Sequence, residues 1–410
     1  MTESVIHIPT SGESIYQTYE RIRQLGSVVP VKLAGEVPAW VAVGRRAVTE
    51  ILANDETLFS KNAKACPALH DGSIPADSPV RIWALVEHML NTDGAEHRRL
   101  RGTINRAFTA SRVTALEPRI RQIIRDLVDN LPCSGDFDLV AHFSAPLPVQ
   151  VICELFGVPP GERAQLRQWV TTDVSKPDLV QAAQLEMIGY LAELLRRKRS
   201  DPGDDLTTAL LRCNESNLLS DGELVGMLWL VIAAGHDTTV HLLSNAVIAL
   251  CTHPHQLAKA LSEDRWSDVV EETLRYRSPS TTSLFRYPLR DVTIDGVDIP
   301  AGSVVCWTGL AELDPERYPN ADVFDIDHDH RGTLAFGRGA HVCLGAALAR
   351  LEGRIALSTL FTRFPRLSLA CELDRIPYGP QIATGGPTSV PVRLEPEPAA
   401  DATAHAAQSG

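Results

Sequence analysis

The sequence predicts a mainly α-helical protein with a small β-rich lobe. Apolar residues recur at helical spacing along most of the chain, the longest apolar run fits one long helix, and strand-like segments are short and few. No internal repeat and no interior linker is visible, which predicts a single domain over residues 1–394. The remaining residues, 395–410, are rich in Pro and Ala without periodicity, and we expect a disordered tail.

The elements can be placed along the chain from these patterns. Residues 112–131 form a helical pattern with one apolar stripe, which consists of Leu116, Ile120, Ile123, Ile124 and Leu127. Residues 179–199 have the same periodicity. We expect strands at 39–43, at two short segments of 286–305 around an Asp-Gly turn, and near 387–394.

The longest predicted helix begins at a capping box in which Ser220 is followed three residues later by Glu223. It continues to about Cys251, where Thr-His-Pro ends it. At 1.5 Å per residue, a helix of about 30 residues spans about 45 Å. Because this helix is apolar on all sides, we expect it to pass through the middle of the fold.

Composition and charge exclude several classes of partner. The chain of 410 residues carries a formal net charge of −12, which argues against a nucleic-acid surface and against an anionic membrane. The N-terminus has neither a basic start nor an apolar core, and the apolar run 227–234 is far shorter than the ~20 residues of a membrane span. We therefore expect a cytoplasmic protein without a membrane anchor.

One of the eight cysteines lies in an unusual loop. No pair has the Cys-x-x-Cys spacing of zinc or iron–sulfur sites, and scattered cysteines are usually small buried hydrophobes. Cys343, however, ends the run Phe-Gly-Arg-Gly-Ala-His-Val-Cys at 336–343, directly before a helical pattern at 345–361. A thiolate at a helix N-terminus is stabilised by free N–H groups and by the helix dipole. The alternative is a buried cysteine in a glycine-rich turn.

The loop resembles the haem-binding signature of the cytochrome P450 superfamily, Phe-Gly-x-Gly-x-His-x-Cys-x-Gly, and matches it at every fixed position. The resemblance implies haem b as cofactor, with Cys343 as the axial thiolate ligand of the iron. It implies that Phe336 packs near the sulfur and that His341 contacts a haem propionate. It also implies the cytochrome P450 fold, with haem between the long central helix and the cysteine loop.

A second motif interrupts the long helix. Ala234, Gly235, His236, Asp237 and Thr238 include poor helix formers, and a carboxylate in a buried helix costs several kcal/mol unless it is paired or used. The motif resembles the family's acid–alcohol pair. That resemblance makes Asp237 and Thr238 catalytic, as proton donors during dioxygen activation, while Ala234 and Gly235 leave room for dioxygen. We assign His236 a structural role; the alternative for the whole motif is a kinked core helix.

Glu272 and Arg275 resemble the family's Glu-x-x-Arg ion pair, and their i, i+3 spacing puts both on one helix face. The third partner of this structural network is usually an arginine, and His328 stands in its place. A further departure is Ala-Glu-Leu-Asp at 311–314, where related bacterial proteins commonly have Ala-Asn-Arg-Asp.

Three more residues resemble the family's contacts to the haem propionates. His97 and Arg101 are four residues apart and share a helix face, and Arg286 precedes the Asp-Gly turn. Together with His341, they make four side chains that can bind the two propionate carboxylates of haem. Arg98 and Arg99 are expected to face elsewhere, towards solvent.

The resemblance implies a bacterial class I haem-thiolate monooxygenase that inserts one oxygen atom from dioxygen into a C–H or C=C bond. No Gly-x-Gly-x-x-Gly nucleotide motif follows a strand, so electrons must come from separate proteins. We expect a ferredoxin and its NAD(P)H reductase as the suppliers. A docking patch for the acidic ferredoxin is expected at Arg98, Arg99, Arg338 and Arg350. Segments 68–77 and 89–94 resemble actinobacterial members that oxidise macrolides, steroids and other secondary metabolites.

The sequence leaves the substrate and the reaction outcome open. Trp83, Leu85, Met89 and Leu284 are expected in the substrate pocket, with 279–285 and 381–388 at its sides, which suits a mid-sized, partly oxygenated molecule. Three alternatives use the same cofactor: oxidative coupling of aromatic or peptide-like metabolites, a peroxide-driven enzyme, and a non-catalytic haem sensor. Peroxide-driven relatives tend to lack the acid–alcohol pair, and a sensor would not need it.

Overall fold

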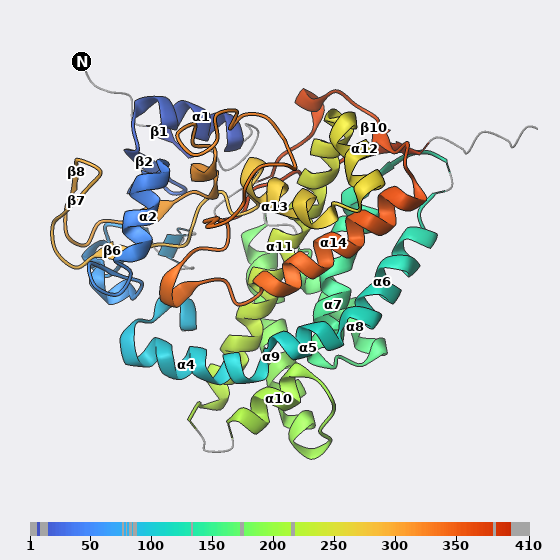
Figure 1. The fold of residues 1–410 in the computed structure, drawn as a ribbon. Helices are drawn as coiled ribbons and strands as arrows, with labels where there is room; N and C mark the ends of the chain where they lie inside the picture. The colour runs from blue at the N-terminus through green and yellow to red at the C-terminus, as the bar shows by residue number, and fades with distance from the viewer. Residues whose placement is uncertain are drawn as a thin grey trace, which may run out of the picture.

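A computed structural model describes residues 6–8, 15–75, 78, 80–81, 84, 88–132, 134–172, 176–214, 218–379 and 383–394. Helices dominate it and the sheets are small, which confirms the predicted fold class (Figure 1). The α-helices are α1 (Ile15–Leu25), α2 (Arg45–Ala53), α4 (Gly94–Ala107), α5 (Ala110–Ala115), α6 (Glu117–Asp129), α7 (Pro146–Phe156), α8 (Arg163–Val170), α9 (Pro177–Ser200), α10 (Leu206–Cys213), α11 (Asp221–Thr252), α12 (Pro254–Glu263), α13 (Trp266–Tyr276) and α14 (Ala346–Arg363).

The β-rich part lies beside α1 and α2, at the left of Figure 1. Its largest sheet has the order β1-β2-β3-β9, in which β2 and β3 are antiparallel and β3 and β9 are parallel. Two pairs, β4-β6 and β7-β8, and a separate sheet, β10-β11-β5, complete the set. The strands are β1 (Ile6–His7), β2 (Val28–Leu33), β3 (Val37–Ala42), β4 (Phe59–Ser60), β5 (Gly135–Asp138), β6 (Tyr287–Pro288), β7 (Val292–Ile294), β8 (Val297–Ile299), β9 (Val305–Trp307), β10 (Ser368–Leu369) and β11 (Pro391–Leu394).

Helix α11 runs through the middle of the helical part. Its capping box is formed as predicted: the Ser220 hydroxyl accepts from the Glu223 N–H, and the Glu223 carboxylate accepts from the Ser220 N–H. The helix packs against α7, α9, α13 and α14, and most of its residues are buried in one large apolar cluster. The apolar sequence of α11 is therefore explained by helices on several sides.

Helix α14, which follows the cysteine loop, packs closely on this centre (Figure 1). A Cβ on Gly353 would stand 2.9 Å from Cγ2 of Val270 on α13 and 3.4 Å from Cδ2 of Leu242 on α11. The glycine thus lets three helices approach one another. This packing holds the first turn of α14, and the loop before it, against the central helix.

The predicted strands at 39–43, around Asp295-Gly296 and near 387–394 correspond to β3, β7 with β8, and β11, and the helices at 179–199 and 345–361 to α9 and α14. The prediction of one helix over 112–131 was wrong. Two helices, α5 and α6, meet at Leu116, because Pro118 has no N–H to continue the helical ladder. Of the predicted apolar stripe, Ile120, Ile123 and Ile124 are buried, while Leu116 and Leu127 are only half-buried.

Within the described residues, every helix is too short or too polar to cross a membrane. Residues 395–410, predicted to be a disordered tail, lie outside the described part of the chain.

A buried carboxylate, Glu272 on α13, anchors the segment that leads to the cysteine loop. Arg275 donates two hydrogen bonds to it, at 2.8 and 2.6 Å, and also donates to the carbonyls of Ala321 and Val323. His328 lies 3.2 Å from one carboxylate oxygen, and His330 lies 2.9 Å from the other. The structure therefore brings the three predicted partners together and adds a second histidine, His330.

Replacing Glu272 should destabilise the fold strongly. Glu272→Ala leaves the Arg275 guanidinium buried without its counter-charge, which typically costs about 3–5 kcal/mol. We expect the midpoint of denaturant unfolding to fall clearly. Glu193→Ala is the matched control, because Glu193 pairs with Arg196 at the same i, i+3 spacing on the exposed surface. Equal midpoints for the two variants would contradict a stabilising role for the buried network.

Candidate functional site

The cysteine loop is a tight turn that depends on two glycines. Gly337 and Gly339 have φ of 69° and 80°, in the left-handed region that side chains disfavour. A Cβ on Gly339 would also stand 3.4 Å from the Leu52 carbonyl oxygen. The Cys343 N–H closes the loop by donating to the Phe336 carbonyl at 2.9 Å. The loop therefore delivers Cys343 to the N-terminus of α14.

The Cys343 side chain is reachable by solvent, whereas Cys66, Cys153 and Cys306 are buried. Crowding by protein atoms raises the pKa of its thiol, while the N–H groups of Gly345 and Ala346 and the charges of Arg101 and Arg350 lower it. The stabilising N–H groups that the sequence predicts are thus present. Burial outweighs them, so the net shift of the pKa is upward, and a metal ion bound at the sulfur would favour the thiolate.

Phe336 carries an arginine on its ring. The Arg350 guanidinium lies 4.4 Å from the ring centroid and is also fixed by two hydrogen bonds to Glu271 on α13. Arg350 is therefore committed to holding the loop on α13. The sequence led us to expect that Arg99 faces solvent. It is instead paired with Glu96 and Glu223.

Helix α11 has one open stretch in its otherwise buried length. Ala234 and Asp237 are exposed, with 56% of the Asp237 side chain accessible, and Gly235 and Thr238 are partly exposed. The Thr238 hydroxyl donates to the Ala234 carbonyl at 2.7 Å, the i−4 bond expected of a threonine within a helix. The four predicted residues thus form one accessible notch.

Asp237 also has a partner that the sequence does not predict. His236, which is buried, places Nδ1 2.8 Å from Oδ1 of Asp237. Burial raises the pKa of the Asp237 carboxyl, but the bond from His236 and the positions of His236 and His241 lower it further, so that the net shift is downward. Asp237 is therefore ionised at neutral pH. His236, for which we expect a structural role, thus makes a direct contact with the acid.

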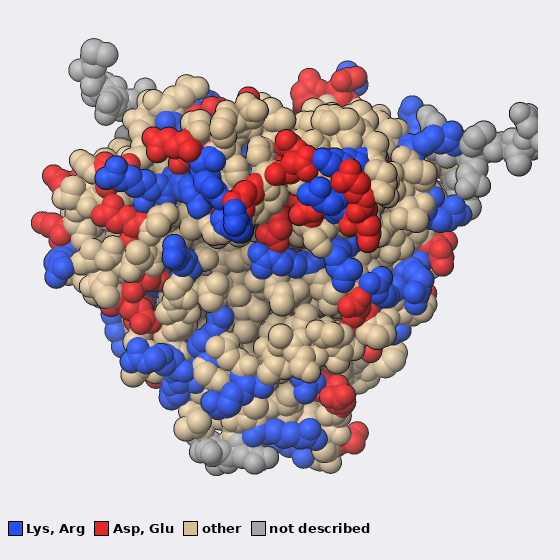
Figure 2. All heavy atoms as spheres, viewed as in Figure 1, with Lys and Arg blue, Asp and Glu red and all other residues tan. Residues whose placement is uncertain are grey.

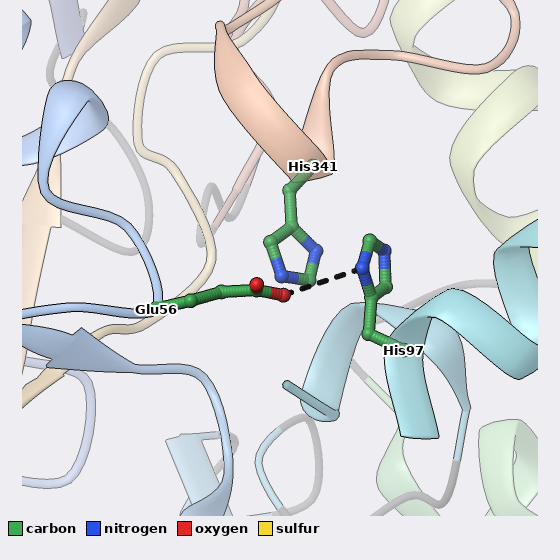
Figure 3. Close-up of side chains that lie close together, drawn as sticks. All are labelled: Glu56, His97 and His341. Carbon is green, nitrogen blue, oxygen red and sulfur yellow. Dashed lines mark ion pairs between the residues drawn. The ribbon is translucent and has the colours of Figure 1, made fainter. Parts of the chain in front are cut away.

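Two histidines, His97, which is buried, and His341, which is half-buried, meet at the base of the cysteine loop (Figure 3). The rings of His97 on α4 and His341 stack with centroids 4.0 Å apart, and none of their four nitrogens has a hydrogen-bond partner in the described part of the chain. Nδ1 of His97 lies 3.5 Å from Oε1 of Glu56, an ion-pair distance. Buried polar atoms are normally satisfied, so these nitrogens mark a site for a ligand.

Cations surround this pair. Arg101 donates to the Val342 carbonyl at 2.8 Å, and Arg286 forms a buried ion pair with Asp55 at 3.0 and 3.1 Å. Lys61 is buried, and no bond to its ammonium is found within the described ranges; burial first, then Arg286, lowers its pKa to about 7. Burial, followed by the charges of Lys61, His97, Arg286 and Arg101, lowers the pKa of His341.

This donor set fits haem. Its two propionates would meet the unpartnered histidines and the cations, and the accessible sulfur of Cys343 would meet its iron. The structure brings Cys343, Phe336, His341, His97, Arg101 and Arg286 around one loop, although Arg286 already has Asp55 as a partner. Sequence reasoning missed Lys61 and Glu56, which follow helix α2 in an irregular segment without a motif.

The predicted pocket residues are only partly placed. Met89 is buried and Leu284 is half-buried, while Trp83 and Leu85 lie outside the described residues. Near Met89, the buried His88 stacks on Trp229 of α11 with centroids 6.0 Å apart, and neither ring nitrogen of His88 has a partner in the ranges given above. His88 is therefore a buried polar group whose hydrogen-bonding capacity is unused by the described residues.

The departure at 311–314 has a structural explanation. Glu312 is buried and forms an ion pair with Arg45 of α2 at 2.7 Å. The other oxygen of Glu312 accepts from the Leu334 N–H, two residues before Phe336. The glutamate thereby ties α2 to the start of the cysteine loop.

Comparisons with known proteins agree with this geometry. A sequence model of the family described as Cytochrome P450 matches residues 266–374. The chain is 45% identical to Cytochrome P450 107B1 of Saccharopolyspora erythraea over 75% of this chain and 77% of that protein. It is 36% identical to 6-deoxyerythronolide B hydroxylase of the same organism, over 93% and 96%. A solved structure of CYP154C4 from Streptomyces with testerone bound superimposes with a TM-score of 0.89 at 32% identity, covering 96% of this chain and 98% of that one.

The propionate assignment predicts weaker retention of haem in variants of α4. His97→Ala and Arg101→Ala should each speed haem loss, since each removes a charge-assisted bond worth about 1.5–3 kcal/mol. The measurement is the haem content that survives gel filtration. Arg106→Ala is the control, because Arg106 is exposed on the same helix and bonds to Thr103 and to the Cys213 carbonyl. Unchanged haem content in the His97→Ala/Arg101→Ala double variant would place the cofactor elsewhere.

Proposed function

Because the chain belongs to the cytochrome P450 family and is a monooxygenase of that family, we propose that it takes electrons from a ferredoxin and its reductase. The proposed reaction is hydroxylation or epoxidation of a mid-sized organic substrate in secondary metabolism. The observation that carries the proposal is the notch in α11, where Asp237 and Thr238 stand open in the middle of a buried helix. In a helix otherwise packed on several sides, this is the stretch where a bound molecule can reach an acid and an alcohol together.

The cofactor in this proposal is haem b, held by Cys343 through its sulfur. His97, Arg101, His341 and Lys61 are the contacts proposed for its propionates, and Arg286 contributes its charge while bound to Asp55. When bound, haem supplies an iron centre that activates dioxygen, and thiolate ligation favours cleavage of the O–O bond.

In this proposal three residues of α11 take part in proton transfer. Asp237 accepts a proton at its carboxylate and is held through Oδ1 by Nδ1 of His236. Thr238 keeps its hydroxyl on the same open stretch, directed at the Ala234 carbonyl, from which it can turn to donate to a bound molecule. A positioned acid and alcohol supply protons in order, which is the work of general acid catalysis.

The substrate class follows from relatives and from the pocket residues. One relative is named for 6-deoxyerythronolide B, and one neighbour in structure holds testerone, both mid-sized molecules with oxygen groups. We propose a substrate of similar size, with His88 as a hydrogen-bonding contact beside the apolar Met89 and Leu284.

The proposed ferredoxin surface lies on the face shown in Figure 2. Lys and Arg predominate over its lower part, where α4, α5 and α10 lie, while both signs of charge are mixed above. Arg98 and Arg338 are exposed, whereas Arg99 and Arg350 are already paired. An acidic protein is therefore attracted locally despite the net charge of −12. The cytoplasmic location expected from the sequence stays a prediction.

Oxidative coupling and a haem sensor remain the alternatives, and one experiment separates all three. The holoprotein is given ferredoxin, its reductase, reduced nicotinamide, 18O-labelled dioxygen and a panel that includes 6-deoxyerythronolide B and testosterone. Compounds that shift the haem spectrum are selected for product analysis by mass spectrometry. We expect a product that has gained one 18O atom. A product joined to a second molecule without 18O would indicate coupling, and no turnover with any donor would indicate a sensor.

The proton relay predicts a specific defect in Thr238→Ala. The hydroxyl is not needed for cofactor binding or reduction, so consumption of reduced nicotinamide should continue while product per electron pair falls and hydrogen peroxide rises. Asp237→Asn should slow the whole cycle instead, because the proton source itself is impaired. The three quantities are measured in parallel. Thr239→Ala is the control, since Thr239 is the next residue but is buried away from the notch. Unchanged coupling in Thr238→Ala would leave that hydroxyl a structural role only.

A further inference from the structure

Among the residues around the proposed propionate site, Glu56 is the one whose presence is hardest to explain by packing. It follows α2 and has φ of 69°, in the left-handed region that glutamate rarely adopts. A glycine would adopt this conformation without strain. Strained residues persist where the surroundings over-determine them, often at functional sites, so the Glu56 side chain calls for a function.

The carboxylate of Glu56 joins two parts of α4. Its Oε1 accepts from the N–H of Gly94, the first residue of the helix, at 3.0 Å. Asp93 holds the N-cap position but makes no cap bond, since its carboxylate is turned towards Ser60 and the N–H groups of Lys61 and Asn62. The same Oε1 of Glu56 lies 3.5 Å from Nδ1 of His97, one turn further along the helix.

Figure 3 shows the Glu56 carboxylate directed at the His97 ring, with the His341 ring beside it. His97 is buried and stacked on His341, so its ring has little freedom to turn. Nδ1 lies at ion-pair distance from Glu56 without a hydrogen bond, whereas the other ring nitrogen, Nε2, has neither an ion pair nor a hydrogen-bond partner in the described part of the chain. This is the arrangement by which a carboxylate fixes the orientation of a histidine that binds something else through its second nitrogen.

We propose that Glu56 is a positioning residue for the cofactor: it holds His97 through Nδ1, so that Nε2 is presented to a haem propionate. The inference rests on the proposed function, because it takes haem as the ligand of this binding site. It also explains why the Glu56 carboxylate lies beside a site proposed to bind the carboxylates of the haem propionates. A histidine that carries a proton on each nitrogen bridges two negative groups that would otherwise repel each other.

The groups around His97 act in both directions, and the net shift of its pKa is downward because burial outweighs the nearby carboxylates. Burial lowers the pKa of His97, Glu56 raises it, Arg101 lowers it, and Asp93 and Asp55 raise it. His341 stacks on the opposite side of the ring. Glu56 is thus the strongest of the groups that favour the cation. Neutralising it lowers the pH at which His97 loses its proton.

The test is the rate at which the purified holoprotein transfers its haem to an apo-globin acceptor, which needs no turnover. Glu56→Gln keeps an oxygen for the Gly94 N–H and removes only the charge. We expect transfer to be about tenfold faster, the ordinary weight of one charge-assisted contact. The rise of the transfer rate with pH should also begin at lower pH. Glu96→Gln is the control, because Glu96 lies in the same turn of α4 but pairs with the exposed side of Arg99.

Repeating the Glu56 substitution in a variant that lacks His97 distinguishes a role of Glu56 in positioning His97 from a role in capping helix α4. In His97→Asn, the additional change Glu56→Gln should alter the transfer rate no further, because the residue it positions is gone. An equal effect in both backgrounds, or no effect in the wild-type background, would overturn the proposal. A wild-type protein that retains no haem would instead overturn the proposed function, so the two failures are distinguishable.

Discussion

The convergence of positive charge on the cysteine loop is the constraint on which the site depends. Lys61, Arg101 and Arg286 come from three separate segments and all act on His341, which lies two residues before Cys343. Asp55 forms an ion pair with Arg286, and Glu56 lies at ion-pair distance from His97. Burying like charges together is costly unless anions offset them. In the proposed complex the two propionates do so, and the same ligand brings a metal that would favour the thiolate at Cys343.

The fold supplies this loop with rigid support on three sides. Glu312 ties its start to Arg45 of α2, Glu271 holds it through Arg350 on Phe336, and Glu272 orders the preceding segment. Behind it, Gly353 lets α14 rest closely on α11 and α13. The loop and the open notch of α11 are thus fixed to the same helical core. Each support of the loop uses one buried or half-buried carboxylate.

Local patterns allowed much of this to be predicted. The capping box at Ser220, the loop at 336–343 and the Glu272–Arg275 pair each lie within ten residues, where spacing determines geometry. The contacts that were missed are non-local or depend on rotamers. Arg45 and Glu312 are far apart in sequence, as are Glu56 and His97, and no periodicity connects them. The bond from His236 to Asp237 depends on how two adjacent side chains turn, and Pro118 divided a helix whose apolar stripe looked continuous.

The central claim is that Cys343 is the ligand of the haem iron, and the spectrum of the reduced carbon monoxide complex tests it most directly. The wild-type protein should show the strongly red-shifted Soret band typical of thiolate ligation. Cys343→Ser should lose that band, while Cys371→Ser, which changes another free and partly exposed cysteine, should keep it. A red-shifted band that survives in Cys343→Ser would show that a different cysteine binds the iron and would contradict the account.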